Sequence, residues 1–167
     1  MSPAKERCSR CGSEKDPGSL FTVDDSRICD TCLYGGHEPF HIYPIGFVSN
    51  SLARKDRGFG VHGNRGRSSI VLFDSQKPFM YRIEEEERLT VVYYLHEARP
   101  VRSVFHRGLD GKEVGVFASR TPDRLSRIAI QNVNLLEVEG TTLVVDGLDA
   151  VNGSPVLDIK MYRKNDR

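Results

Sequence analysis

All four cysteines of the chain lie in two Cys-x-x-Cys pairs near its beginning. Cys8 and Cys11 form the first pair, Cys29 and Cys32 form the second, and seventeen residues separate the pairs. A Cys-x-x-Cys turn places two thiolates on one side of a knuckle, and two knuckles complete a tetrahedral four-sulfur shell around Zn²⁺ with no open position. The spacing therefore predicts a structural zinc site, with two disulfides or a redox dithiol as the alternatives.

The segment between the cysteine pairs predicts a small hairpin. Leu20–Val23 and Ser26–Cys29 are short extended runs around Asp24–Asp25, which is typical of a zinc ribbon. A module of about 38 residues is too short for an apolar core alone to hold it together. Metal ligation supplies about 10 to 16 kcal/mol of folding free energy in comparable modules. We therefore expect a zinc ribbon over residues 1–38.

Other groups of charged or metal-ligating residues have simpler interpretations. His37 and His41 follow the second cysteine pair and are expected to be loop histidines, with spare zinc ligands as the alternative. The acidic run Glu84–Glu87 is expected to be a solvated face. A glycine-containing basic segment is either a loop that follows an RNA backbone or a flexible surface insertion. Its basic residues are Arg54, Lys55, Arg57, Arg65 and Arg67.

Length, hydropathy and charge limit the class of protein. The 167 residues allow one ordinary domain and a small appendage. No apolar run approaches the roughly 18 to 20 residues that cross a bilayer, and the first residues lack an apolar targeting core. We therefore expect a cytoplasmic protein without a membrane partner. The net charge is +1, but residues 99–127 hold seven basic and three acidic residues. A positive surface is predicted along that segment.

Most of the chain after the ribbon is predicted to form strands. The expected strands are rich in β-branched and aromatic residues and end at polar or glycine-containing segments. They are Ser69–Phe73, Leu89–Leu95, Glu113–Phe117, Ile128–Glu139 and Thr141–Val145. Helical periodicity is weak, and Gln76–Arg88 is the best short candidate. The pattern predicts a mainly β protein with a partly closed β-barrel over residues 39–167.

Two motifs in the last third of the chain carry a family resemblance. Gly115–Pro122 reads GVFASRTP, and Gly147–Asp149 is followed by Ser154–Lys160, which reads SPVLDIK. Upstream, Tyr43–Val48 and Val91–His96 fit an opening strand and an aromatic strand that ends in histidine. In this order the motifs resemble the TsaA-like, or TrmO, methyltransferase family, in which the first two flank the binding site of S-adenosylmethionine.

The resemblance implies a β-barrel enzyme that uses S-adenosylmethionine. Its expected activity is N6-methylation of threonylcarbamoyladenosine in the tRNA anticodon loop, and its expected assembly is a homodimer. The family reads Arg-Pro-Asn-Pro-Ile-Gly where this chain has Arg124–Ala129, so both prolines and the glycine are missing. Two alternatives therefore stay open: an inactive module that docks RNA or protein, and a methyltransferase with a different acceptor.

The resemblance also implies roles for individual residues. Arg120 closes the first motif and is expected to bind the cofactor carboxylate or an RNA phosphate, with an ion pair inside the barrel as the alternative. His96 and Glu97 are expected to border the cofactor, and Ile130 to pack on its adenine side.

A loop in the second motif is expected to wrap the cofactor. It consists of Asp149, Ala150, Val151 and Asn152. Asn152 precedes a glycine, so the same residues also fit a hairpin turn. Arg124 and Tyr162 are expected to contact the RNA substrate, although Tyr162 equally fits a residue that closes the barrel.

Overall fold

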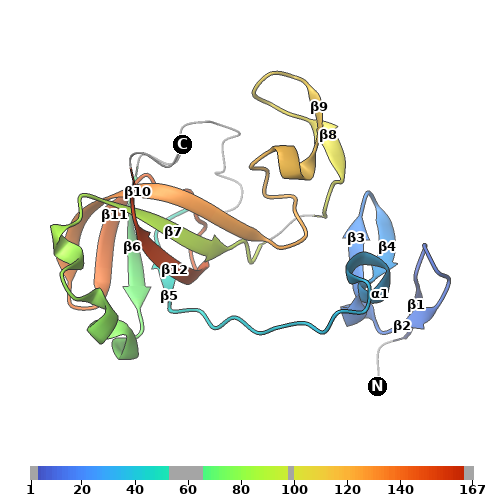
Figure 1. Cartoon of the computed structure of the whole chain (residues 1–167), viewed down its shortest axis with the longest axis horizontal. Coiled ribbons are helices and arrows are strands. Elements are labelled where there is room, and N and C mark those ends of the chain that lie inside the picture. Colours follow the sequence, from blue (N-terminus) through green and yellow to red (C-terminus); the bar gives the residue numbers. More distant parts are fainter. Residues whose placement is uncertain (1–3, 53–65, 98–99, 164–167) are drawn as a thin grey trace. The chain divides into compact units, whose positions relative to one another are not determined.

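The computed structural model describes residues 4–52, 66–97 and 100–163, which form two compact units (Figure 1). We call Met1–His41 with Ala98–Leu125 the ribbon unit, and Ile42–Glu97 with Ser126–Arg167 the barrel unit. The first boundary lies close to the one predicted after residue 38. The segment Ala98–Leu125, here called the insertion segment, was predicted to be part of the barrel domain but is grouped with the ribbon.

Six strands of the described residues form a closed barrel in the order β10-β11-β6-β5-β12-β7, and β7 pairs with β10 to close it. All pairings in the barrel are antiparallel. The strands are β5 (Gly46–Ser49), β6 (Arg67–Leu72), β7 (Arg88–Tyr94), β10 (Ile128–Glu139), β11 (Thr142–Asp146) and β12 (Pro155–Met161). The predicted mainly β fold with a barrel is confirmed, and the barrel is closed.

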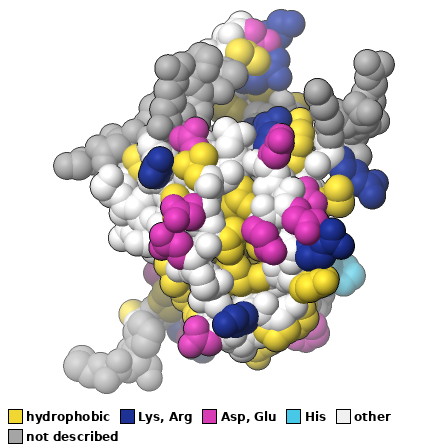
Figure 2. Space-filling model, turned by 90° about the vertical axis from the view of Figure 1, so that its left-hand side faces the viewer, with side chains coloured by type: hydrophobic (Ala, Val, Ile, Leu, Met, Phe, Trp, Pro, Cys, Tyr) yellow, Lys and Arg dark blue, Asp and Glu magenta, His cyan; other side chains and the backbone are white. Residues whose placement is uncertain are grey.

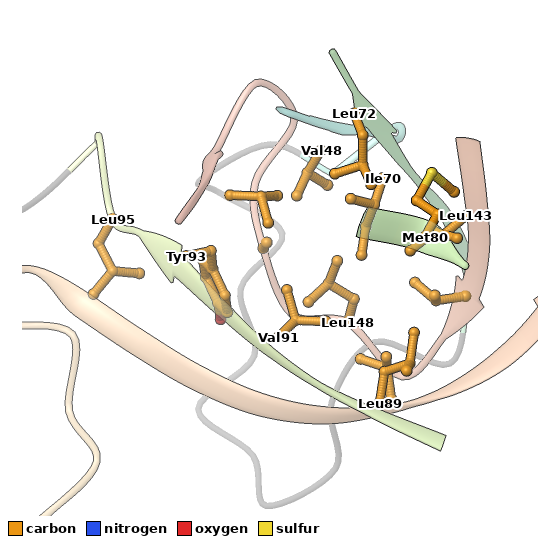
Figure 3. Packing of buried hydrophobic residues seen from close by; sticks show 14 residues of the cluster. Val48, Ile70, Leu72, Met80, Leu89, Val91, Tyr93, Leu95, Leu143 and Leu148 are labelled. Atoms are coloured by element: carbon orange, nitrogen blue, oxygen red, sulfur yellow. The ribbon is translucent and has the colours of Figure 1, made fainter. Parts of the chain in front are cut away.

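Buried apolar side chains, which alternate with more exposed residues along the strands, fill the inside of the barrel. In β7, Leu89, Val91 and Tyr93 are buried, whereas the residues between them are exposed or half-buried. Successive side chains of a strand point to opposite faces, so one face of β7 contributes to the core. Figure 3 shows these side chains converging with Val48, Ile70 and Leu143 from other strands. This packed interior fixes the positions of the loops at the two ends of the barrel.

The predicted helix over Gln76–Arg88 is wrong. The chain forms two 3-10 helices there, η3 (Asp74–Met80) and η4 (Ile83–Glu85). Pro78 lies inside the first of them. Arg82 has a left-handed φ of 62°, so an α-helix cannot continue through this residue. Figure 2 shows both acidic and basic side chains around an apolar strip on one face of the molecule.

The ribbon part of the ribbon unit contains two small hairpins. Its elements are β1 (Glu6–Arg7), β2 (Glu14–Lys15), η1 (Pro17–Ser19), β3 (Leu20–Val23), β4 (Ser26–Cys29) and α1 (Asp30–Tyr34). The predicted hairpin around Asp24–Asp25 is confirmed, because β3 and β4 pair in antiparallel register from Leu20 with Cys29 to Val23 with Ser26.

The insertion segment forms a hairpin of β8 (Val104–His106) and β9 (Glu113–Gly115), followed by the 3-10 helix η5 (Val116–Ala118). The strand predicted over Glu113–Phe117 therefore ends early. Val101, near the beginning of the insertion segment, forms a parallel bridge with Val23 of β3. This bridge and the hydrogen bonds beside it explain why the segment belongs to the ribbon unit.

Most of the predicted basic segment lies outside the described residues, since Arg54, Lys55, Arg57 and Arg65 fall between residues 53 and 65. Its last member, Arg67, begins β6. Within the described ranges, no helix has the length and apolar character that a membrane span needs.

Candidate functional site

The four cysteines lie together at one end of the β3–β4 hairpin. Their Sγ atoms are all within 4.8 Å of one another, and the distances from Cys8 to Cys32 and from Cys11 to Cys29 are both 3.9 Å. Four sulfurs at about 2.3 Å from a tetrahedral Zn²⁺ lie about 3.8 Å apart, whereas a disulfide needs about 2.05 Å. The cysteines are free in the structure, so the spacing fits a metal shell and gives no support to the disulfide alternative.

Local backbone geometry turns each cysteine pair into a knuckle. In the first, Gly12 adopts a φ of +72° and donates its N–H to the Cys8 carbonyl over 2.8 Å. In the second, Cys29 ends β4 and precedes α1, which carries Cys32. Gly35 ends that helix with a φ of 68°, a conformation that glycine adopts without steric cost.

Hydrogen bonds within the cluster spread the thiol pKa values apart. The Cys29 backbone N–H donates to the Cys8 sulfur over 3.3 Å, and this bond lowers the pKa of the Cys8 thiol to about 6. The Ser13 side chain lowers the pKa of Cys11. The Cys29 thiol and burial raise the pKa of Cys32 to about 12. A dication bound by the four sulfurs would lower the pKa of all four thiols, because its charge favours the thiolate form of every ligand.

The other candidate ligands do not join this cluster. Among the described residues, the group of side chains that could hold a metal ion consists of the four cysteines alone. His37 and His41 are exposed in the chain that follows α1. Glu84–Glu87 are exposed or half-buried, as expected for a solvated charge run.

The second part of the candidate site is the loop from Gly147 to Ser154, here called the 147–154 loop, which joins β11 to β12. Gln131 of β10 holds its first half. The Gln131 side-chain amide donates to the Gly147 carbonyl over 2.6 Å, and its oxygen accepts the Asp149 N–H over 3.0 Å. The Tyr93 hydroxyl donates to the Asp149 carbonyl over 3.2 Å. These bonds fix the backbone on both sides of Leu148, which is fully buried.

Asn50, which follows β5, holds the second half of the 147–154 loop. Its side-chain amide donates to the Ala150 carbonyl over 2.9 Å and to the buried Ser68 hydroxyl over 3.0 Å. Its backbone N–H donates to the Asn152 side-chain oxygen over 3.1 Å. The Asn152 N–H donates in turn to the Leu52 carbonyl over 3.0 Å. The loop is therefore pre-organised by side chains from three strands or their ends.

Several predicted cofactor residues come together here. The His96 ring Nδ1 lies 3.3 Å from the Ser154 hydroxyl, which places His96 beside the loop, and Glu97 follows it as a half-buried residue. Asp149 is half-buried and Asn152 is exposed, whereas the side chains of Ala150 and Val151 are buried. The last two residues can therefore offer a ligand only backbone groups. Ile130, next to Gln131 on β10, is 59% exposed.

Tyr162 lies apart from this group. It follows β12 and its ring stacks on Arg88, whose guanidinium carbon is 4.0 Å from the ring centroid. Arg88 begins β7 and His96 follows its end, and a strand of this length spans about 20 Å. The structure thus places Tyr162 and His96 at opposite ends of β7.

The predicted arginines belong to the insertion segment of the ribbon unit. Arg120 is exposed. Arg124 is half-buried and donates to the carbonyls of Thr121 over 2.9 Å and Ser119 over 2.7 Å. Its guanidinium therefore folds the chain around Arg120 onto itself.

Sequence reasoning missed the residues that hold the 147–154 loop. Asn50, Gln131 and Ser154 are polar, and a polar residue within or beside an apolar strand is a usable signal for a buried hydrogen bond. Tyr93 lies in the aromatic strand that the sequence predicts, but the sequence does not indicate a partner for its hydroxyl. The partners are 16 to 102 residues away in the chain, so no local pattern reveals them.

Known proteins are similar to this chain over more than half of its length. The family model described as tRNA-methyltransferase O N-terminal domain matches residues 59–166. An S-adenosyl-L-methionine-binding protein of Archaeoglobus fulgidus is 40% identical over 96 residues, which are 57% of this chain and 68% of that protein. A tRNA (adenine(37)-N6)-methyltransferase of Mus musculus is 30% identical over 94 residues, 54% of this chain and 22% of that protein.

A solved structure of TrmO from P. aeruginosa is similar in fold, with a TM-score of 0.61 and 24% sequence identity. The similarity covers 78% of this chain and 58% of the TrmO chain. The chain thus spans less than two thirds of the length of that structure and about a fifth of the mouse protein.

Proposed function

The chain belongs to the family of tRNA-methyltransferase O N-terminal domains, and from this membership we propose that it is an S-adenosylmethionine-dependent methyltransferase that acts on tRNA. The finer proposal is that its acceptor is N6 of threonylcarbamoyladenosine in the anticodon loop. Zn²⁺ bound by the four cysteines has a structural role in this proposal. The homodimer and the cytoplasmic location stay predictions.

The observation that carries the proposal is the pre-organised 147–154 loop beside His96. Asp149 offers a carboxylate suited to ribose hydroxyls, and Ala150 and Val151 offer backbone groups because their side chains are buried. These donors and acceptors fit a nucleoside such as the adenosine of S-adenosylmethionine. A loop that is already held by hydrogen bonds loses little conformational entropy when a ligand binds.

S-adenosylmethionine supplies a methyl group on a positively charged sulfur, which a nitrogen nucleophile attacks directly. The protein therefore needs to contribute mainly positioning, because holding two reactants in line makes the reaction effectively unimolecular. In this proposal Asp149 and the loop backbone orient the cofactor, and His96 and Glu97 limit the access of water at the edge of the barrel.

Recognition of tRNA needs positive charge and stacking surfaces. Residues 99–127 hold seven basic residues, of which Arg120 is exposed, and the same segment exposes the aromatic ring of Phe117. Arg120 in this scheme pairs with an RNA phosphate or with the cofactor carboxylate.

Calorimetric titration of the zinc-loaded protein with S-adenosylmethionine tests the proposal. We expect saturable binding that is weakened at least about tenfold in Asp149→Ala and in Arg120→Ala, since each removes a charge-assisted contact. Glu139→Ala and Lys112→Ala are matched controls, because they remove the same charges at exposed positions outside the site.

The alternatives predict different outcomes in this titration and in a methylation assay with tRNA. A docking module without catalysis predicts no binding of S-adenosylmethionine at millimolar concentration. A changed acceptor predicts cofactor binding without methylation of tRNA that carries threonylcarbamoyladenosine. Either result would contradict the corresponding part of the proposal.

A further inference from the structure

The insertion segment is tied to the β3–β4 hairpin of the ribbon through its first residues. The Val101 N–H donates to the Thr22 carbonyl over 3.0 Å, and the Asp24 N–H donates to the Val101 carbonyl over 2.9 Å. The Val101 side chain is 5% exposed and belongs to the same buried cluster as Cys8 and Cys29. The segment thus shares a core with two of the candidate metal ligands.

The turn of the hairpin adds contacts from two aspartates. Asp24 and Asp25 adopt φ values of 47° and 62°, where glycine or asparagine is the usual choice. Both Asp24 oxygens accept hydrogen bonds from Ser103, one from its N–H over 2.9 Å and one from its hydroxyl. Asp25 pairs with Arg102 over 2.9 Å in an exposed ion pair. The contacts that these two aspartate side chains make with the insertion segment offset the strain of the left-handed backbone at this turn.

The residues that touch the ribbon also hold both ends of the first motif. The Val116 N–H donates to the Ser103 carbonyl over 3.0 Å, and the Arg102 N–H donates to the Asp123 carbonyl over 3.3 Å. The stretch Val116–Asp123, which we call the arginine loop, contains Arg120. Ser103 therefore anchors the beginning of the arginine loop, and Arg102 anchors its end. Leu125, just beyond it, packs against the buried cluster of the ribbon.

We propose that the ribbon positions the arginine loop. Asp24 is the positioning residue: through its hydrogen bonds to Ser103 it holds the arginine loop in place for as long as the metal-bound hairpin stays folded. The conformational part of this inference is independent of the proposed function. Only its consequence for cofactor affinity rests on that function.

Amide hydrogen exchange, followed by NMR on the full zinc-loaded chain, tests the role of Asp24. Asp24→Gly removes the carboxylate but suits the left-handed φ. We expect exchange at the Ser103 and Val116 amides to become about tenfold faster, because hydrogen bonds to a charged group are among the stronger ones. Asp25→Gly is the matched control in the same turn, and we expect little change because its ion pair is exposed. Equal exchange in the two variants would overturn the proposal.

Ser103→Ala provides a second route if Asp24→Gly does not fold. It removes only the hydroxyl bond to Asp24, and we expect faster exchange at Val116 in the same direction but to a smaller extent. Retained zinc content shows that the change begins at the contact and not at the metal. Unchanged exchange at Val116 in Ser103→Ala would count against the proposal.

Metal removal tests the link from the cysteines to the arginine loop. After chelation we expect faster exchange in both the β3–β4 hairpin and the arginine loop, with continued protection of β7 and β10. An arginine loop that stays protected without metal would overturn the coupling.

Cofactor affinity separates this inference from the proposed function. If the wild-type chain binds S-adenosylmethionine, we expect Asp24→Gly to weaken binding several-fold; equal affinity despite faster exchange would overturn the functional consequence. If the wild-type chain does not bind it, the proposed function fails, and the exchange results alone decide the positioning role.

Discussion

Gln131 holds two backbone groups of the 147–154 loop with a single side chain. Its amide is bonded to the Gly147 carbonyl and its oxygen to the Asp149 N–H. We expect Gln131→Ala to lower the free energy of unfolding by about 1 to 3 kcal/mol, because it leaves a partly buried donor and acceptor without partners. Urea unfolding, monitored by circular dichroism, measures the change.

Asn132→Ala is the matched control, because the neighbouring side chain is exposed and bonds only to Thr90 in the described contacts. Gln131→Ala should also weaken binding of S-adenosylmethionine, since the loop loses its fixed shape. A variant as stable and as competent in binding as Asn132→Ala would show that Gln131 does not organise the loop.

The cysteines and the loop residues differ in how far the sequence reveals them. The four cysteines were predicted as a group because metal chemistry restricts both their type and their spacing. Asn50 and Gln131 carry no such restriction, since an amide forms hydrogen bonds with any backbone that tertiary structure brings to it. The sequence therefore predicts the metal ligands directly, but it gives only the approximate place of the loop.

At the level of elements, Gly46 of β5 marks the closest approach between strands. A Cβ at this position would lie 2.3 Å from the Val71 carbonyl oxygen and 2.7 Å from the Leu72 Cα. Both atoms belong to backbone, so no side-chain movement relieves the clash. We expect Gly46→Ala to destabilise the barrel by at least about 1 to 3 kcal/mol, the usual cost of overpacking.

Thermal unfolding of Gly46→Ala, compared with Gly108→Ala, measures this cost. A Cβ at Gly108 meets no atom within 4 Å, so the control reports the general effect of replacing glycine with alanine. The barrel signal should shift to a lower melting temperature only in Gly46→Ala. Equal melting temperatures would mean that β5 and β6 separate without cost.

The strands Leu89–Leu95 and Ile128–Glu139 were predicted more accurately than the helix. The runs Leu89–Leu95 and Ile128–Glu139 correspond to β7 and β10 within one residue, since alternation and β-branched residues determine both. The predicted helix over Gln76–Arg88 failed at Arg82, whose left-handed backbone ends any α-helix. Barrel closure depends on the pairing of β7 with β10, which no local pattern shows.

At the level of the whole molecule, the two units have separate cores. The buried cluster of the barrel unit, which includes Ile70, Leu89 and Leu143, takes all its members from residues 45–97 and 126–167. The cluster of the ribbon unit takes its members from the ribbon and the insertion segment. The sequence predicted a single boundary because both cysteine pairs precede it, whereas the contacts of Val101 and Ser103 are visible only in three dimensions.

Separate cores predict that the barrel folds alone. In the proposed variant, residues 1–41 are removed and residues 98–125 are replaced by a short Gly-Ser linker. Tyr94 pairs with Ile128, and the Leu95 N–H donates to the Arg127 carbonyl over 2.8 Å, so the chain ends that the linker joins lie close together. We expect cooperative urea unfolding and dispersed NMR signals of a β protein.

The same variant lacks Arg120, so we expect it to bind S-adenosylmethionine more weakly than the full chain. Leu89→Ala in this variant is the stability control, because truncation of a fully buried leucine costs about 2 to 5 kcal/mol in a packed core and little in a loosely collapsed one. Non-cooperative unfolding that Leu89→Ala leaves unchanged would show that the barrel needs the ribbon unit to fold. Cooperative unfolding with weakened cofactor binding would show that the barrel unit is stable by itself and that the removed residues contribute to cofactor affinity.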